Sequence, residues 1–305
     1  MKKTKLIDRI NSTNNLFKTI RTEKEIIMVK RSIIQKVQGK ATQDGAGVKL
    51  VRVLSRPNIY SFDPFLMLDA FDSSDPNDYI LGFPWHPHRG IETITYLIEG
   101  KIEHQDSLGN KGVIEDGDCQ WMSAGRGILH QEMPKAAKRM LGVQLWLNLS
   151  KKNKMTPPKY RDIVSKNIPI HSFDNVVIKI LSGEFLNKRG AIAPDYVPLT
   201  FVDIAMEENA AFTIPTPIND TVFIYVVEGE VDFNQNGLIE PAKTAYLFSA
   251  GDRIEVNTKN KSARFFVFIA PPLHEPIAWG GPIVMNTETE LQQAFSEIRT
   301  NTFIQ

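Results

Sequence analysis

Two short histidine motifs are the parts of this sequence whose residue types and spacing suggest chemistry. His86 and His88 are separated by one proline, and His130 and Glu132 are separated by one glutamine. Because side chains alternate between the two faces of a strand, each pair directs both of its side chains to one face. If both pairs face the interior of one β-barrel, three imidazoles and one carboxylate converge. A single H-x-H pair is common by chance and can lie on a surface, whereas two same-face pairs on separate strands are much more specific.

The donor set of these motifs suits a metal ion with an open coordination shell. Three nitrogens and one oxygen, with room left for water, favour Fe(II), Mn(II), Ni(II) or Cu(II). A closed structural zinc site would be expected to use thiolates, and Cys119 is the only cysteine in the sequence. Pro87 cannot donate a sheet hydrogen bond, which places the first motif at a strand edge where a ligand can enter. The motifs therefore predict a catalytic or sensing metal site.

The segments that must position these residues are typical of an all-β protein. Short runs rich in β-branched, aromatic and leucine residues alternate with turn residues, as in 91–98, 141–149 and 263–270. In 141–149, leucine or valine occupies every second position, which predicts one apolar face. Helical spacing occurs near the end, at 288–299. Many short strands with regular turns favour β-sandwiches or barrels, followed here by a short C-terminal helix.

An internal repeat divides the chain. The segment YLIEGKIE (96–103) resembles YVVEGEVD (225–232), and Ser-Ala-Gly follows in each copy. This self-similarity predicts two tandem domains of one fold. The second copy has no histidine between His171 and His274, so it cannot build the same metal site and is interpreted as a structural partner. The expected organisation begins with a basic, polar and poorly ordered extension (1–27) and a first barrel with the metal site (28–150). A linker (151–160), a second barrel without a metal site (161–286), and a C-terminal helix and tail (287–305) follow.

Composition excludes several protein classes. The 305 residues are 42 % hydrophobic and 23 % charged, with a net charge of +1, so no overall field favours nucleic acid or an anionic membrane. No apolar run approaches the length needed to cross a bilayer. The single cysteine excludes an intramolecular disulfide, as expected of a reducing compartment. We therefore expect a cytoplasmic globular protein.

Two motif-bearing stretches, HPHRGIETITYLIEG and DGDCQWMSAGRGILHQEMP, closely resemble the pirin family of the cupin superfamily. TQDGAGVKLVRVL, NIYSFDPFLMLDAF and PLHEPIAWGGPIVMN are also similar to pirin, so that the resemblance spans 28–286. It implies an all-β bicupin, with two tandem antiparallel jelly-roll barrels face to face and Fe(II) in the first barrel alone. Manganese, nickel, copper and zinc are alternatives. The metal ligands that the resemblance implies are His86, His88, His130 and Glu132.

The resemblance also implies candidate functions. Pirin-like proteins are similar to quercetin 2,3-dioxygenases, which implies a metal-dependent dioxygenase that opens the ring of quercetin-type flavonols with O2. Glu132 would then take the proton of the flavonol 3-hydroxyl. The alternative is an iron-containing, redox-sensing regulatory protein that acts through protein partners, as a transcriptional co-regulator or a modulator of a metabolic enzyme. A third reading is a metal-containing cupin with another small-molecule substrate. A polyphenol and O2 are the expected partners, without direct contact with nucleic acid or membrane, and a monomer is expected.

Several neighbouring residues admit two interpretations. Glu92 is an alternative carboxylate ligand, because general cupins often use the position four residues after H-x-H and strand parity gives it the face of His88. Arg89 and Arg126 either steer an anionic or phenolate substrate or form ordinary ion pairs outside the barrel. His104 is either a base in the substrate pocket or a solvated strand histidine. Three further side chains are interpreted as packing rather than chemistry: Trp121, Met122 and Cys119.

Overall fold

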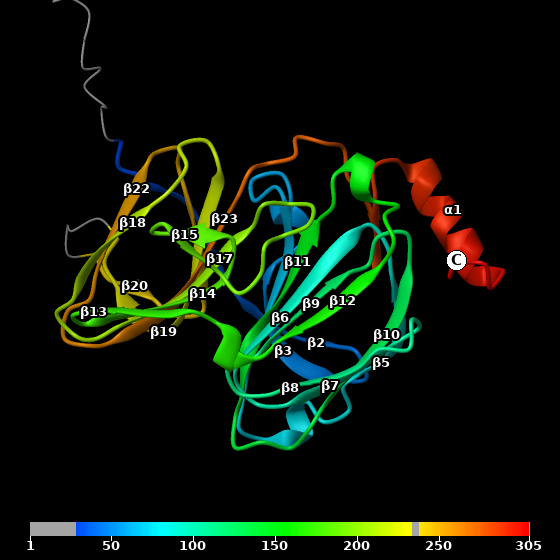
Figure 1. The fold of residues 1–305 in the computed structure, drawn as a ribbon, viewed down its shortest axis with the longest axis horizontal. Helices are drawn as coiled ribbons and strands as arrows, with labels where there is room; N and C mark the ends of the chain where they lie inside the picture. The colour runs from blue at the N-terminus through cyan, green and yellow to red at the C-terminus, as the bar shows by residue number, and fades with distance from the viewer. Residues whose placement is uncertain (1–28, 234–237, 305) are drawn as a thin grey trace, which may run out of the picture.

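The computed structural model describes residues 29–233 and 238–304. The expected N-terminal extension, 1–27, lies outside the described residues. Figure 1 shows two β-structures side by side, with α1 (Glu288–Arg299), the one α-helix of the described residues, at the outer end of the first. Within the described part of the chain, no helix has the length and apolarity needed to cross a membrane.

The first barrel consists of a larger and a smaller antiparallel sheet. The larger has the strand order β12-β9-β6-β11-β4-β3-β2, and the smaller has the order β5-β10-β7-β8. The strands of the larger sheet are β2 (Lys40–Asp44), β3 (Val48–Leu54), β4 (Phe65–Ser73), β6 (Ile91–Glu99), β9 (Cys119–Ser123), β11 (Met140–Asn148) and β12 (Lys159–Ile163). Those of the smaller sheet are β5 (Phe83–His88), β7 (Ile102–Asp106), β8 (Lys111–Ile114) and β10 (Ile128–Pro134).

The second barrel repeats this plan without the histidine motifs. Its large sheet has the order β1-β21-β19-β23-β17-β14-β13, with β20 paired to β19, and β18 pairs with β22. The bounds are β1 (Ile33–Gln38), β13 (Ile170–Phe173), β14 (Val176–Ser182), β17 (Thr200–Met206), β18 (Ala211–Pro215), β19 (Thr221–Val231), β20 (Glu240–Pro241), β21 (Thr244–Phe248), β22 (Arg253–Asn257) and β23 (Ala263–Ala270). The described residues also form two short strand pairs and four 3-10 helices: β15 (Glu184–Phe185), β16 (Lys188–Arg189), β24 (Ala278–Gly280), β25 (Ile283–Met285), η1 (Arg56–Asn58), η2 (Pro76–Asp78), η3 (Lys151–Asn153) and η4 (Ser165–Asn167).

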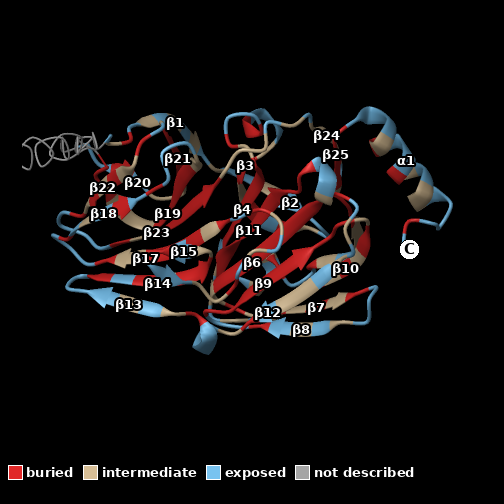
Figure 2. Ribbon diagram, turned by 45° about the horizontal axis from the view of Figure 1, so that its top comes forward, coloured by how far each residue is buried: buried red, intermediate tan, exposed pale blue. Residues whose placement is uncertain are grey.

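The two large sheets pack face to face, which confirms the predicted bicupin. The two repeat copies begin in β6 and β19, each of which is an inner strand of its large sheet. Tyr96 of β6 and Tyr225 of β19 belong to one buried cluster that contains residues of both barrels. The Tyr96 hydroxyl donates a hydrogen bond to Asp203 of the second barrel at 2.7 Å. Figure 2 shows these central strands as the buried part of the molecule.

The alternation predicted for 141–149 explains how the two faces of β11 contact different parts of the protein. Its leucine and valine side chains at 141, 143, 145 and 147 enter the core between the barrels. The opposite face carries Gln144, Trp146 and Asn148, which are also buried. Because β11 is central in its sheet, this second face looks into the first barrel. The strand thus separates an apolar interface from a more polar barrel interior.

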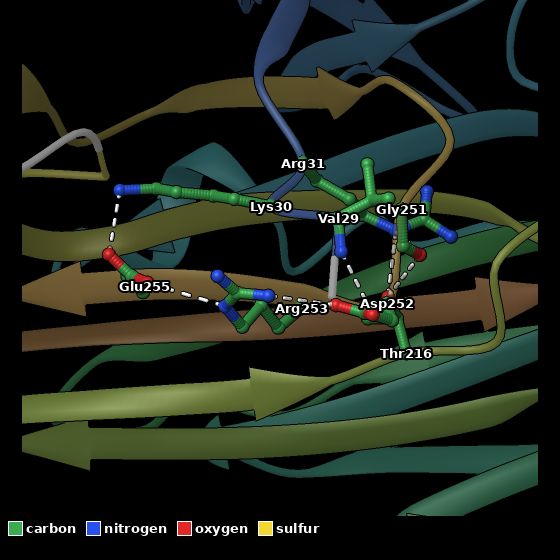
Figure 3. Close-up of polar contacts among 8 residues, drawn as sticks. All are labelled: Val29, Lys30, Arg31, Thr216, Gly251, Asp252, Arg253 and Glu255. Carbon is green, nitrogen blue, oxygen red and sulfur yellow. Dashed lines mark hydrogen bonds and ion pairs between the residues drawn. The ribbon is translucent and has the colours of Figure 1, made fainter. Parts of the chain in front are cut away.

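The start of the described chain is fixed to the second barrel, as Figure 3 shows. The Val29 amide donates to Asp252 at 3.0 Å, and Lys30 pairs with Glu255 at 2.8 Å. The buried Arg31 guanidinium donates to Thr216 Oγ1 and to the Gly251 carbonyl. β1 then pairs with β21 of the second sheet. The expected division at residue 28 grouped this segment with the first barrel, whereas its hydrogen bonds join it to the second.

The C-terminal arm, residues 278–303, returns to the first barrel. Within this arm β24 pairs with β25, and the Val284 amide donates to the Arg89 carbonyl at 3.1 Å. The predicted helix is present as α1, with a capping box between Thr287 and Glu290. Its buried residues Leu291 and Ala294 pack with β25. The arm therefore lies beside the strand that carries His86 and His88.

Candidate metal centre

The three histidines of the two motifs converge in the first barrel. β5 and β10 are antiparallel neighbours, and His130 lies directly opposite His86 in the register. His88 follows two residues later on the same face of β5. The ring centroids of His86 and His130 are 4.3 Å apart, and the ligand nitrogens of the three side chains all lie within 4.8 Å of one another. The spacing thus places these three imidazoles together.

Backbone carbonyls determine which ring nitrogens are free. His86 Nδ1 lies 2.9 Å from the Pro84 oxygen, and His88 Nδ1 lies 3.1 Å from the Pro282 oxygen. A carbonyl oxygen only accepts hydrogen bonds, so each imidazole in its neutral form carries its proton on Nδ1. The two Nε2 atoms are then proton-free and face each other at 3.1 Å. Lone pairs at this separation repel unless a cation lies between them, so the donor set fits a divalent metal ion.

Burial keeps His88 and His130 neutral. Desolvation, assisted by the neighbouring His86, lowers the pKa of His88 to about 3. Burial and the nearby imidazoles also hold the pKa of His130 well below its ordinary value. Neither ring nitrogen of His130 has a hydrogen-bond partner among the described residues. A neutral, buried and unpartnered imidazole is the form that coordinates a metal.

Glu132 faces the same barrel interior but stands apart from the 4.8 Å histidine cluster, which does not include it. Its Oε2 accepts a hydrogen bond from Gln144 Nε2 at 2.8 Å, and its Oε1 accepts one from Thr95 Oγ1 at 3.3 Å. The register between β10 and β5 shifts between His130 and Glu132, so a bulge separates these two positions on that side. The carboxylate is buried, and both of its hydrogen-bond donors belong to the larger sheet of the barrel.

Glu92 lies on the other face of its sheet, and the expectation that it shares the face of His88 is wrong. Its carboxylate accepts a hydrogen bond from Ser123 Oγ, and burial raises its pKa. Thr95, which bonds Glu132, defines the inward face of β6, and Glu92 has the opposite parity. The reason is Gly90, whose φ of +79° turns the chain from the small sheet into the large one. Alternation does not continue through such a break.

Arg89 and His104 are structural. Arg89 is buried, pairs with Glu297 of α1 at 2.7 Å and packs on the Phe303 ring, so the ion-pair interpretation is the one observed. His104 is buried rather than solvated: its Nε2 meets Asp106 at 3.2 Å and its Nδ1 accepts from Gln120 at 3.0 Å. With both nitrogens engaged, it is not placed to act as a base.

The packing interpretation also holds for Trp121, Met122 and Cys119, which are buried in the cores.

A cavity of about 730 Å³ opens beside the cluster. Its lining includes His86 and His88, together with Gln144, Trp146 and Trp279. Sequence reasoning missed the last three residues. The first two were detectable as large polar or aromatic side chains on the face of 141–149 opposite the leucines. Trp279 is remote in sequence from both motifs, and nothing local places it at this cavity.

The comparisons with known proteins agree with this fold. The Pirin family model matches residues 47–147, and the Pirin C-terminal cupin domain model matches residues 201–304. A pirin-like protein of Solanum lycopersicum is 39 % identical over 269 residues, covering 88 % of this chain and 91 % of that protein. Human pirin is 38 % identical over 274 residues, covering 88 % and 92 %. The crystal structure of quercetin 2,3-dioxygenase from Acinetobacter baumannii matches with a TM-score of 0.83 and 32 % identity, covering 90 % of this chain and 98 % of that one. On these grounds, the chain belongs to the pirin family.

Proposed function

We propose that this protein is a metal-dependent dioxygenase that opens the ring of quercetin-type flavonols with O2. The observation that supports it best is the pair of proton-free Nε2 atoms, of His86 and His88, 3.1 Å apart on the wall of a 730 Å³ cavity. This volume lies within the range of small-molecule sites. The similarity to the Acinetobacter enzyme adds a chemical precedent for the same fold.

In this proposal the ion would be held by His86, His88 and His130, and Glu132, whose carboxylate lies outside the 4.8 Å histidine cluster, would be the fourth ligand. Fe(II) is the expected ion, and Mn, Ni, Cu or Zn fit the same donors. When bound, the ion supplies Lewis-acid charge that acidifies the flavonol 3-hydroxyl and prepares the resulting enolate for reaction with O2. The Nδ1–H bonds of His86 and His88 fix both rings with Nε2 toward the ion.

Glu132 is the proposed catalytic base. Its two oxygens are oriented by Gln144 and Thr95, and each retains a free lone pair with which to accept the 3-hydroxyl proton. Glu132 is only 2 % exposed, so its carboxylate has little contact with bulk water. The overall reaction adds both atoms of O2 to the flavonol, cleaves its central ring and releases carbon monoxide.

The test is to load the full chain anaerobically with Fe(II), add quercetin and admit air. We expect the visible absorption of quercetin to disappear with release of carbon monoxide. Glu132→Gln should keep some metal, held by the three histidines, and lose about 100-fold or more in turnover per bound ion, because it cannot accept the proton. Glu103→Gln is the matched control, since Glu103 pairs with Lys135 at the surface.

Two results would contradict the proposal. Metal-loaded protein that consumes no quercetin or related flavonol would overturn the dioxygenase assignment and favour the regulatory alternative. Full turnover in Glu132→Gln would remove the base role while leaving the reaction in place.

A further inference from the structure

The cavity beside the histidine cluster has an aromatic wall built from two distant parts of the chain. Trp146 comes from β11, and Trp279 comes from β24 in the C-terminal arm. Their ring centroids are 5.9 Å apart with an interplanar angle of 40°. The Trp146 ring in turn meets His88 edge-on at 4.9 Å. The rings of Trp279, Trp146 and His88 therefore form a continuous row in space from the C-terminal arm to the imidazole cluster.

Trp279 is held in place by its own surroundings. Its indole Nε1 donates to the Gly281 carbonyl at 2.8 Å. The Arg56 guanidinium lies 5.5 Å from the ring centroid and donates to the Trp279 carbonyl. These contacts orient the indole before any ligand arrives, so that little conformational freedom is lost when a second ring stacks on it.

Trp146 offers a hydrogen bond that the protein does not use. Its Nε1 is buried and finds no acceptor in the part of the chain that the structure describes. An indole nitrogen is only a donor, and leaving a buried donor unpaired is costly. Because Trp146 lines the cavity, a ligand oxygen can supply the missing acceptor.

The remaining charges of the lining are balanced. Arg52 binds Asp69 through two hydrogen bonds, at 2.9 and 2.7 Å, and also contacts Asp44 at 2.6 Å. Arg56 supplies the second positive charge against these two carboxylates. The two arginines and two aspartates of the lining thus balance one another, which leaves the aromatic wall as the feature that a ligand can recognise.

We infer that Trp146 and Trp279 form an aromatic clamp that selects planar ligands of two or more rings. The ligand stacks on Trp279, and one of its carbonyl or hydroxyl oxygens accepts the hydrogen bond of Trp146 Nε1. This inference deepens the proposed function, on which it rests for the flavonol as probe. It adds that the C-terminal arm, and not only the metal-bearing barrel, determines which substrates enter.

The test is calorimetric titration of Fe(II)-loaded protein with quercetin and with the single-ring catechol, both without oxygen. Trp146→Phe keeps the ring and removes the donor, so quercetin should bind about fivefold to tenfold more weakly. Trp279→Ala should weaken quercetin about threefold to tenfold and leave catechol almost unchanged. Trp121→Phe is the control, because Trp121 is buried in the core between the barrels. Iron content is measured for every variant.

Each outcome separates the clamp from the dioxygenase. Quercetin affinities of Trp146→Phe and Trp279→Ala equal to wild type would overturn the clamp, even if turnover in air is normal. Weaker binding that only parallels loss of iron would also overturn it, because Trp146 would then act by supporting His88. The expected pattern without consumption of quercetin in air would support the clamp and overturn the dioxygenase. Wild-type protein that binds no quercetin would overturn both.

Discussion

At the scale of single residues, the centre depends on backbone oxygens as much as on the histidines. The spacing of His86 and His88 gives their shared face, but the carbonyls of Pro84 and Pro282 decide that Nε2 is the free nitrogen of each ring. One of these carbonyls belongs to the C-terminal arm, 194 residues away in sequence. A motif can therefore name the ligands, whereas their tautomers depend on the tertiary fold.

Removal of the metal should destabilise the protein. Without a cation, two Nε2 lone pairs face each other at 3.1 Å, and an ion that binds only the folded state adds about 4 kcal/mol at a thousandfold excess over its dissociation constant. We expect chelation to lower the melting temperature and Fe(II) or Zn(II) to restore it. His86→Ala should melt at the same temperature with and without metal. Equal melting of wild-type protein in both conditions would argue against a metal centre.

Gln144 should matter through Glu132. Gln144→Leu removes the 2.8 Å hydrogen bond that orients the carboxylate, and loss of such a contact typically costs 10- to 100-fold in activity or metal affinity. We expect turnover of quercetin to fall by about this factor, measured together with metal content. Gln131→Leu is the control, because Gln131 lies on β10 between the two motif residues and bonds Gln105 instead. Equal effects of the two substitutions would show that the orientation of Glu132 is unimportant.

At the scale of elements, strand alternation predicted the site where a strand is continuous and failed where it is interrupted. Within β10, and within β5, residues two apart share a face, and the histidines converge. Between β5 and β6 the chain turns at Gly90 with φ of +79°, and Glu92 leaves the face of His88. The position of Trp279 at the cavity could not be predicted, for another reason. Contacts between segments far apart in sequence leave no local periodicity to detect.

The attachment of the C-terminal arm should depend on one ion pair. Glu297→Gln removes the negative charge that pairs with the buried Arg89 at 2.7 Å, which we expect to cost about 1 to 3 kcal/mol of local stability. Hydrogen exchange of the α1 amides should become correspondingly faster. Glu288→Gln is the control, because Glu288 contacts only the exposed Gln292 among the described side chains. Unchanged exchange in Glu297→Gln would mean that this ion pair does not help to hold α1.

At the scale of the whole molecule, charges at the edge of the interface connect the two barrels. Asp72 of β4 accepts hydrogen bonds from Arg139 of the first barrel and from Lys243 of the second. Arg139 also reaches Glu228 of β19 at 2.7 Å. Burial alone would raise the pKa of Asp72, but these two cations hold it below its ordinary value. The network supplements the apolar core between the sheets.

This network predicts a pH dependence of stability. A carboxylate whose pKa is lower in the folded state stabilises the fold above its unfolded pKa of about 3.9, and this contribution is lost as the pH falls through the folded pKa. Asp72→Asn should therefore lower the free energy of unfolding by about 1 kcal/mol at pH 7 and by progressively less in acid. Urea unfolding of wild type and Asp72→Asn, at pH 7 and in acid, measures this difference in the free energy of unfolding. A difference that is the same under both conditions would contradict its ionic origin.

The position of β1 has a consequence for dividing the polypeptide. A cut in 151–160 would separate each half from a piece that it needs: the N-terminal fragment would take away the edge strand bonded to β21, and the C-terminal fragment would take away the carbonyl that fixes His88. Neither fragment should fold to its native structure when expressed alone. When the two fragments are mixed, each should reach its native structure only by binding the other.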